Sequence, residues 1–106
     1  MGRPRNTLID VQMDIERSTG STVSFVAFVG AGTHETAARL ALAALPAYYD
    51  QLTGRPDSAK EITSVKVTSV FTRGAPINAG AIPHRVFDMA MKRDNGWFSI
   101  TPSFEN

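Results

Sequence analysis

The sequence predicts a single α+β domain of 106 residues, with a mostly antiparallel four-stranded sheet and two helices on one face, in the order ββαβαβ. Two patterns lead to this prediction. From Ile9 to Ile15, apolar side chains alternate with polar ones, which is typical of a strand with one buried face. From Ala37 to Tyr48, apolar side chains recur at helical spacing, which is typical of a helix packed on a sheet.

The first two strands are predicted to form a β-hairpin. The first covers residues 7–16, and Gly20 lies in the polar turn that follows, where glycine adopts a positive φ readily. The second covers residues 22–29 and is apolar on both faces, so we expect it to be central in the sheet. The charged face of the first strand favours a place nearer an edge, or a face open to water.

The first helix is predicted to begin after Thr33, whose side chain is a good N-cap, and to end at Gly54. We expect Pro46 to kink or restart it, because proline lacks a helical donor and clashes with the preceding turn. The stripe expected to pack on the sheet consists of Ala37, Leu40, Ala41, Ala44, Leu45 and Tyr48.

The second half of the chain is predicted to contain two strands and one helix. Residues 62–72 form the third strand, with Val65, Val67 and Phe71 on its buried face. Residues 73–82 form a loop, and a second helix runs from Pro83 to Arg93, where proline suits the first helical position. Its expected apolar stripe is Val86, Phe87, Ala90 and Met91. A short last strand follows at 97–101.

Composition restricts the chemistry available to the chain. It is 42% hydrophobic and 20% charged, with a net charge of +1 and no cysteine. Disulfides and thiolate catalysis are therefore excluded. Residues 1–6 are expected to form a flexible basic arm before the domain at 7–106. No signal core follows this arm and no apolar run is long enough to span a bilayer, so we expect a soluble, cytoplasmic protein without membrane contact.

Catalytic residues are not evident in the sequence. His34 and His84 each lie near a predicted helix start, and neither has a second histidine or an acid at metal-binding spacing. The segment Gly30-Ala31-Gly32 joins a strand to a helix but lacks the lysine of a phosphate-binding loop. We therefore expect no metal, no cofactor and no catalytic site. A small enzyme with a pocket between subunits stays an alternative.

Two surfaces are predicted to bind a protein partner. Asp10, Asp14 and Glu16 lie along one face of the first strand and would attract a basic partner, such as a surface of a nucleic-acid-handling complex. The 73–82 loop would supply further contacts, because loops on a rigid scaffold often bind. The candidate residues in this loop are Arg73, Ile77, Asn78 and Ile82. The aromatic residues Tyr48 and Tyr49 of the first helix are further candidates.

The leading hypothesis is therefore a small non-enzymatic binding protein, similar in general style to accessory proteins and inhibitors of phages and mobile elements. A homodimer is compatible with it. The alternative is a nucleic-acid-binding module, because Gly2-Arg3-Pro4-Arg5 is similar to the core of an AT-hook, whose arginines enter the DNA minor groove. Its candidate residues are Arg3, Arg5, Arg55, Lys60, Arg85, Lys92 and Arg93.

Overall fold

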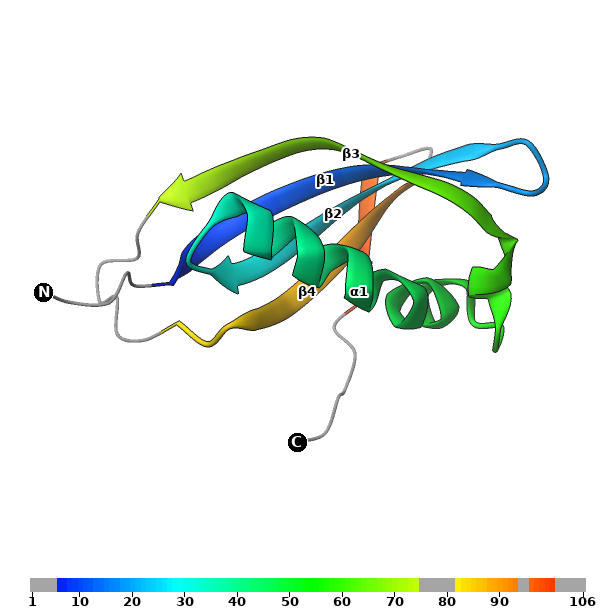
Figure 1. Cartoon of the computed structure of the whole chain (residues 1–106). Coiled ribbons are helices and arrows are strands. Elements are labelled where there is room, and N and C mark those ends of the chain that lie inside the picture. The colour runs from blue at the N-terminus through cyan, green and yellow to red at the C-terminus, as the bar shows by residue number, and fades with distance from the viewer. Residues whose placement is uncertain (1–5, 75–81, 94–95, 101–106) are drawn as a thin grey trace, which may run out of the picture.

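The computed structural model describes residues 6–74, 82–93 and 96–100 of the chain (Figure 1). Its elements follow in the order β1 (Thr7–Arg17), β2 (Thr22–Ala31), α1 (His34–Thr53), the 3-10 helix η1 (Ser58–Glu61), β3 (Ile62–Gly74), β4 (Arg85–Arg93) and β5 (Gly96–Ile100). The predicted α+β class is confirmed. The order is different from the prediction, because a strand replaces the second helix.

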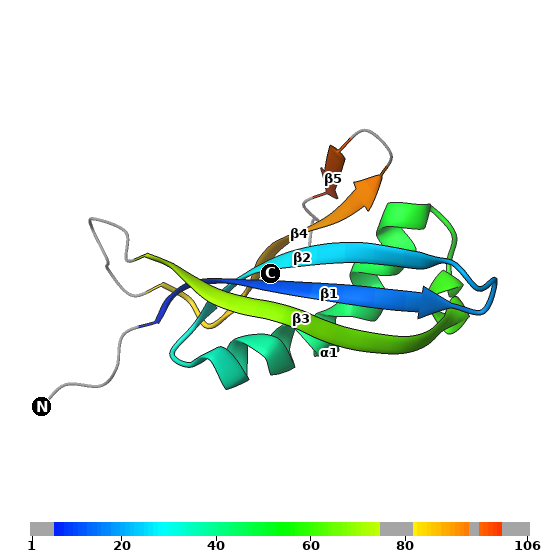
Figure 2. The same ribbon diagram turned by 90° about the horizontal axis from the view of Figure 1, so that it is seen from above.

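The strands form one antiparallel sheet in the order β3-β1-β2-β4-β5. α1 lies against one face, and the opposite face has no helix among the described residues (Figures 1 and 2). We call this second face the open face. The predicted sheet had four strands with both helices on one face, whereas this sheet has five strands and, in the described part, one α-helix covering it.

The hairpin prediction is confirmed. β1 pairs with β2 in continuous register from Thr7 opposite Ala31 to Glu16 opposite Thr22. Gly20 in the turn has a φ of 92°, which glycine adopts without strain. β1 lies between β3 and β2, so its charged face reflects exposure on the open side of the sheet and not a place at the sheet edge.

α1 packs its apolar stripe onto the sheet as predicted. Its buried residues are Ala37, Ala41, Leu45, Tyr48, Tyr49 and Leu52, whereas Leu40 and Ala44 are half-buried. Thr33 caps the helix by accepting a hydrogen bond from the backbone N–H of Thr36 at 3.1 Å, and Gly54 ends it with a φ of 72°. α1 continues through Pro46 without a restart. Within the described residues, no helix is long and apolar enough to cross a membrane.

The prediction of a second helix is wrong, because residues 85–93 form the strand β4. A β-bulge explains why this segment has the apolar spacing of a helix. Phe28 of β2 pairs with Asp88, but the next residue, Val29, pairs with Val86, so Phe87 is an extra residue in β4. The bulge places Val86 and Met89, three residues apart, on the same face of the strand. This spacing imitates the period of a helix.

β3 contains the same device three times. Its register with β1 shifts at three extra residues, which are spaced five positions apart: Thr63, Thr68 and Arg73. The Thr63 hydroxyl donates to the Glu16 carbonyl at 3.1 Å, and the Thr68 hydroxyl donates to the Gln12 carbonyl at 3.3 Å. Bulges bend a strand and increase its twist. β3 accordingly arches along the sheet edge (Figure 1).

The bulge at Thr68 overturns the predicted face of Phe71. Before the bulge, Val65 and Val67 face the core, as predicted. After it, Val70 takes that side, and Phe71 turns to the open face with 46% of its surface exposed. One inserted residue inverts the alternation because side chains of a strand repeat every two residues.

Gly30 belongs to β2, whereas the sequence prediction ended this strand at residue 29. A Cβ atom built at this position would lie 2.7 Å from Ile82 Cγ2 and 2.9 Å from Phe87 Cε2, and would collide with the backbone carbonyl of Pro83. The glycine is needed because the chain entering β4 passes directly over it.

The first prediction concerns the core. Leu45→Ala should lower the free energy of unfolding by about 2–5 kcal/mol, since Leu45 is 2% exposed between α1 and the sheet. Leu42→Ala on the outer side of the same helix is the matched control, expected to change it by about 0.5 kcal/mol or less in dilute protein. Equal losses for both variants in urea titrations would show that α1 packs by another face.

The second prediction concerns Gly30. Gly30→Ala should lower the free energy of unfolding by about 1–3 kcal/mol, because the rigid Pro83 carbonyl has to move. Gly32→Ala is the control, since its Cβ would meet only the Asn6 side chain at 3.5 Å. Urea unfolding of both variants gives the comparison, and a stable Gly30→Ala protein would contradict the close approach.

Candidate protein-binding face of the sheet

The open face carries a row of four side chains across four strands. The register places Phe71 of β3 opposite Asp10 of β1, Asp10 opposite Phe28 of β2, and Phe28 opposite Asp88 of β4. Figure 2 shows this face, with α1 behind the sheet. Directly opposite residues on one face of a sheet lie close enough for side-chain contact. The row therefore brings two aromatic rings to either side of Asp10.

Arg73 covers this row. Its Nε and NH2 groups donate to the two carboxylate oxygens of Asp10 at 3.1 and 2.8 Å, and its guanidinium lies 5.0 Å from the ring centroid of Phe28. The Asp10 side chain is 8% exposed and the Arg73 side chain 51% exposed. A buried carboxylate requires such a partner, because leaving it unpaired is costly.

The guanidinium is fixed in both charge and orientation. The hydrogen bonds that Arg73 donates to Asp10, followed by the negative charge of that carboxylate, raise the pKa of Arg73 above its already high ordinary value. The contact with Asp10 occupies one edge of the planar group, so NH1 on the other side can donate to a further acceptor. We call Asp10, Phe28, Phe71 and Arg73 the aromatic–arginine patch.

The predicted acidic surface is largely matched by opposite charge and hydrogen bonds. Asp10 is buried beneath Arg73, and Asp14 accepts a hydrogen bond from the Ser24 hydroxyl at 2.8 Å and lies opposite Lys66. Glu16 alone of the three acids is exposed. Arg73, predicted in a separate loop, lies at the end of β3 and joins the acidic face.

The two tyrosines predicted as contact residues belong to the core. Tyr48 and Tyr49 are 1% and 0% exposed, so neither side chain can reach a partner. Burial, and then the charge of Asp88, raise the pKa of Tyr48. Ile82 is half-buried, and its carbonyl accepts a hydrogen bond from Asn6 at 2.8 Å. The other two loop candidates, Ile77 and Asn78, lie outside the described residues.

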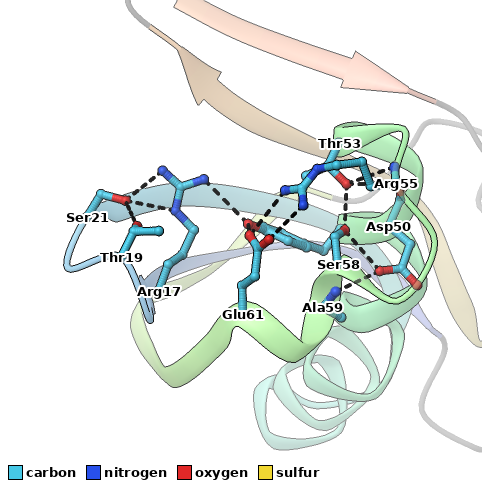
Figure 3. Close-up of polar contacts among 10 residues, drawn as sticks. Arg17, Thr19, Ser21, Asp50, Thr53, Arg55, Ser58, Ala59 and Glu61 are labelled. Carbon is cyan, nitrogen blue, oxygen red and sulfur yellow. Dashed lines mark hydrogen bonds and ion pairs between the residues drawn. The ribbon is translucent and has the colours of Figure 1, made fainter.

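A second polar cluster joins the turn of the hairpin to the end of α1 (Figure 3). Arg17 donates to the Ser21 hydroxyl through Nε and NH2 at 2.9 and 2.7 Å, and to the Tyr49 hydroxyl at 3.4 Å. Tyr49 donates to Glu61 at 3.2 Å, and Arg55 donates to both Glu61 oxygens at 2.7 and 3.2 Å. The cluster gives the hydroxyl of a buried tyrosine its partners, which is a structural role.

Asp50 fixes η1 to the same end of the helix. Its Oδ1 accepts hydrogen bonds from the Ala59 backbone N–H at 2.8 Å and from the Ser58 hydroxyl at 3.2 Å (Figure 3). The Ser58 hydroxyl also lies 2.5 Å from that of Thr53. These contacts reverse the chain between α1 and β3 and hold the Asp50 carboxylate in one position.

The basic residues that were candidates for nucleic-acid binding do not form one continuous surface in the described part of the chain. Arg55 is bound to Glu61, Lys60 is exposed in η1, and Arg85 lies 4.7 Å above the ring of Phe87. Lys92 is exposed seven residues beyond Arg85, roughly 23 Å along β4. Arg3, Arg5 and the side chain of Arg93 lie outside the described part of the chain.

Both histidines are exposed. His34 Nε2 lies 2.8 Å from the Thr72 hydroxyl, which connects the start of α1 to β3. His84 is exposed just before β4. Within the described residues, no three His, Asp or Glu side chains come together as metal ligands.

The chain matches none of the protein-family models, curated proteins or solved structures with which it was compared.

The third prediction concerns pH. Hydrogen bonding by Arg55 is the main reason that the pKa of Glu61 lies below its ordinary value of 4.5. The ionised carboxylate therefore stabilises the fold at neutral pH, and this contribution is lost as the pH falls below about 4.5 and through the lower folded value. Glu61→Gln should lower the melting temperature at pH 7, with the difference from wild type shrinking in acid.

The control for this experiment is salt. At about 1 M NaCl the screening length falls to roughly 3 Å, so the difference at pH 7 should be smaller for this exposed pair. A difference between the two proteins that is unchanged down to pH 2 would show that Glu61 acts through packing and not through its charge.

Proposed function

We propose that this chain is a small non-enzymatic binding protein that recognises another protein through the open face of its sheet. The aromatic–arginine patch is the observation that supports the proposal. Phe71 exposes 46% of its surface beside an arginine whose orientation is fixed by Asp10 and Phe28. Aromatic residues and arginine are enriched among residues that dominate protein–protein binding energy.

The chemistry of the patch indicates what a partner supplies. Phe71 offers an exposed ring that gains from burial against an apolar side chain. Arg73 offers the NH1 side of its guanidinium to a carboxylate or carbonyl oxygen. Because the guanidinium is already held by Asp10, little side-chain entropy is lost when a partner binds it.

A protein fits this face better than a nucleic acid does. Nucleic-acid binding depends on a basic surface that follows the phosphates. On the open face, Arg73 pairs with Asp10 and Lys66 lies opposite Asp14, so both cations of β3 on this face have an acid beside them. We therefore expect only weak, non-specific binding of duplex DNA or RNA, with a Kd of about 10⁻⁴–10⁻⁶ M at physiological salt.

The fourth prediction tests this face. A partner is first captured from the native host with wild-type protein, and its binding kinetics are then measured for three variants. Phe71→Ala should raise the Kd about 10- to 100-fold, mainly through faster dissociation. Glu16→Lys, at the exposed end of β1, should instead change the association rate and its dependence on salt. Phe71→Ala leaves the core intact, because its side chain lies outside it.

The matched control is Leu42→Ala, which removes the other large exposed apolar side chain of the described residues, on α1. Wild-type kinetics for Phe71→Ala together with slowed binding for the control would exclude the open face as the contact surface. Submicromolar, sequence-selective binding of an oligonucleotide would favour the nucleic-acid alternative in its place.

A further inference from the structure

The outer side of α1 is apolar at its centre. Leu42, Ala43, Pro46 and Ala47 are all exposed, and Leu42 exposes 40% of its surface. The chain carries no charged residue from Leu40 to Tyr49. Because the inner side of this stretch faces the sheet, the middle of α1 is apolar all round. A helix on the surface of a globular domain normally carries charged and polar residues on its outer face.

A charged residue lies at each end of this apolar centre, on the outer side of α1. Arg39, Ala43, Pro46 and Asp50 follow one another at spacings of four, three and four residues, so they lie along one side of the helix. Arg39 exposes 70% of its side chain, and its contact with Glu35 is long, at 3.8 Å. The line therefore begins with a cation and ends with an anion.

From this arrangement we infer that the outer side of α1 binds a second copy of the same chain, with the two helices antiparallel about a two-fold axis near Ala44 and Leu45. In this arrangement Arg39 of one copy meets Asp50 of the partner subunit. Two equivalent ion pairs then close the interface, one at each end. Antiparallel packing also places the positive N-terminal end of each helix beside the negative C-terminal end of the other.

The two-fold axis also pairs large side chains of one copy with small side chains of the other. Leu42 faces the partner subunit's Ala47, and Pro46 faces the partner subunit's Ala43, so each larger side chain meets an alanine. Alanines at a helix contact allow the two axes to approach closely. An isologous contact of this kind is self-complementary, which is the requirement for a two-fold dimer.

Asp50 is positioned in advance for this role. Both of its hydrogen bonds to η1 are accepted by Oδ1, from Ala59 and from Ser58, and they fix the direction of the carboxylate. Its second oxygen accepts no hydrogen bond from the described residues, and in the proposed dimer it accepts from the guanidinium of the partner subunit's Arg39. A carboxylate that is already ordered loses less freedom on pairing.

This contact leaves the open face of the sheet free. α1 and the open face lie on opposite sides of the molecule, so a dimer can present two aromatic–arginine patches (Figure 1). The inference therefore does not depend on the proposed function. The apolar outer side of α1 is small, so we expect a weak dimer with a Kd of roughly 10–100 µM.

Analytical ultracentrifugation of the full chain tests the inference. Wild-type protein between about 10 µM and 1 mM should pass from monomer to dimer. Ala43→Glu should abolish the dimer in this range, because it places two like charges beside the axis, while circular dichroism and urea unfolding show an intact fold. Ser64→Glu adds the same charge to exposed β3 and should leave the dimer unchanged. Arg39→Glu should weaken the dimer about tenfold or more, since each ion pair becomes a repulsion.

Cross-linking tests the geometry independently. The chain contains no cysteine, so a single introduced thiol reacts alone. Ala43→Cys should give a covalent dimer with a short bismaleimide, and Ser64→Cys should give little. A wild-type monomer at 1 mM overturns the inference. So does a dimer that is insensitive to Ala43→Glu, or equal cross-linking at both positions, since either result places the contact on another surface.

Discussion

Packing of α1 against one face of the sheet forms the hydrophobic core of the domain. It buries the apolar side of β1 and β2, and it brings Tyr48 and Tyr49 into the core. In the described part of the chain α1 covers one face, and side chains of the strands stabilise the other. Among these side chains are the buried carboxylate of Asp10 and the two that cover it, Arg73 and Phe28.

The bulges of β3 decide which side chains occupy the open face. Each extra residue reverses the alternation, and the bulge at Thr68 moves Phe71 from the core side to the open side. The bulge at Arg73 places the guanidinium where it reaches Asp10. Bulges also bend a long edge strand, which reduces its ability to pair with a foreign strand. The same irregularities thus protect the edge and shape the proposed binding face.

Two surfaces of different chemistry lie on opposite sides of the molecule. The open face offers an aromatic ring and an oriented arginine, a combination suited to a heterologous protein partner. The outer side of α1 offers small apolar side chains between a cation and an anion, a pattern that complements itself under a two-fold axis. Each surface has its own reporter residue, Phe71 or Ala43, so the two proposals can fail separately.

Elements with local signals are predictable from the sequence alone. The hairpin follows from alternation and a turn glycine, and α1 from Thr33, its apolar stripe and Gly54. The sequence indicates both Asp10 and Arg73 as candidates, but on separate surfaces. Contacts between distant segments account for their pairing, the exposure of Phe71, the strand at 85–93 and the need for Gly30. A β-bulge is a property of two paired strands, because it depends on how many residues of one strand lie opposite the other. The sequence of a single strand therefore does not show where the register shifts.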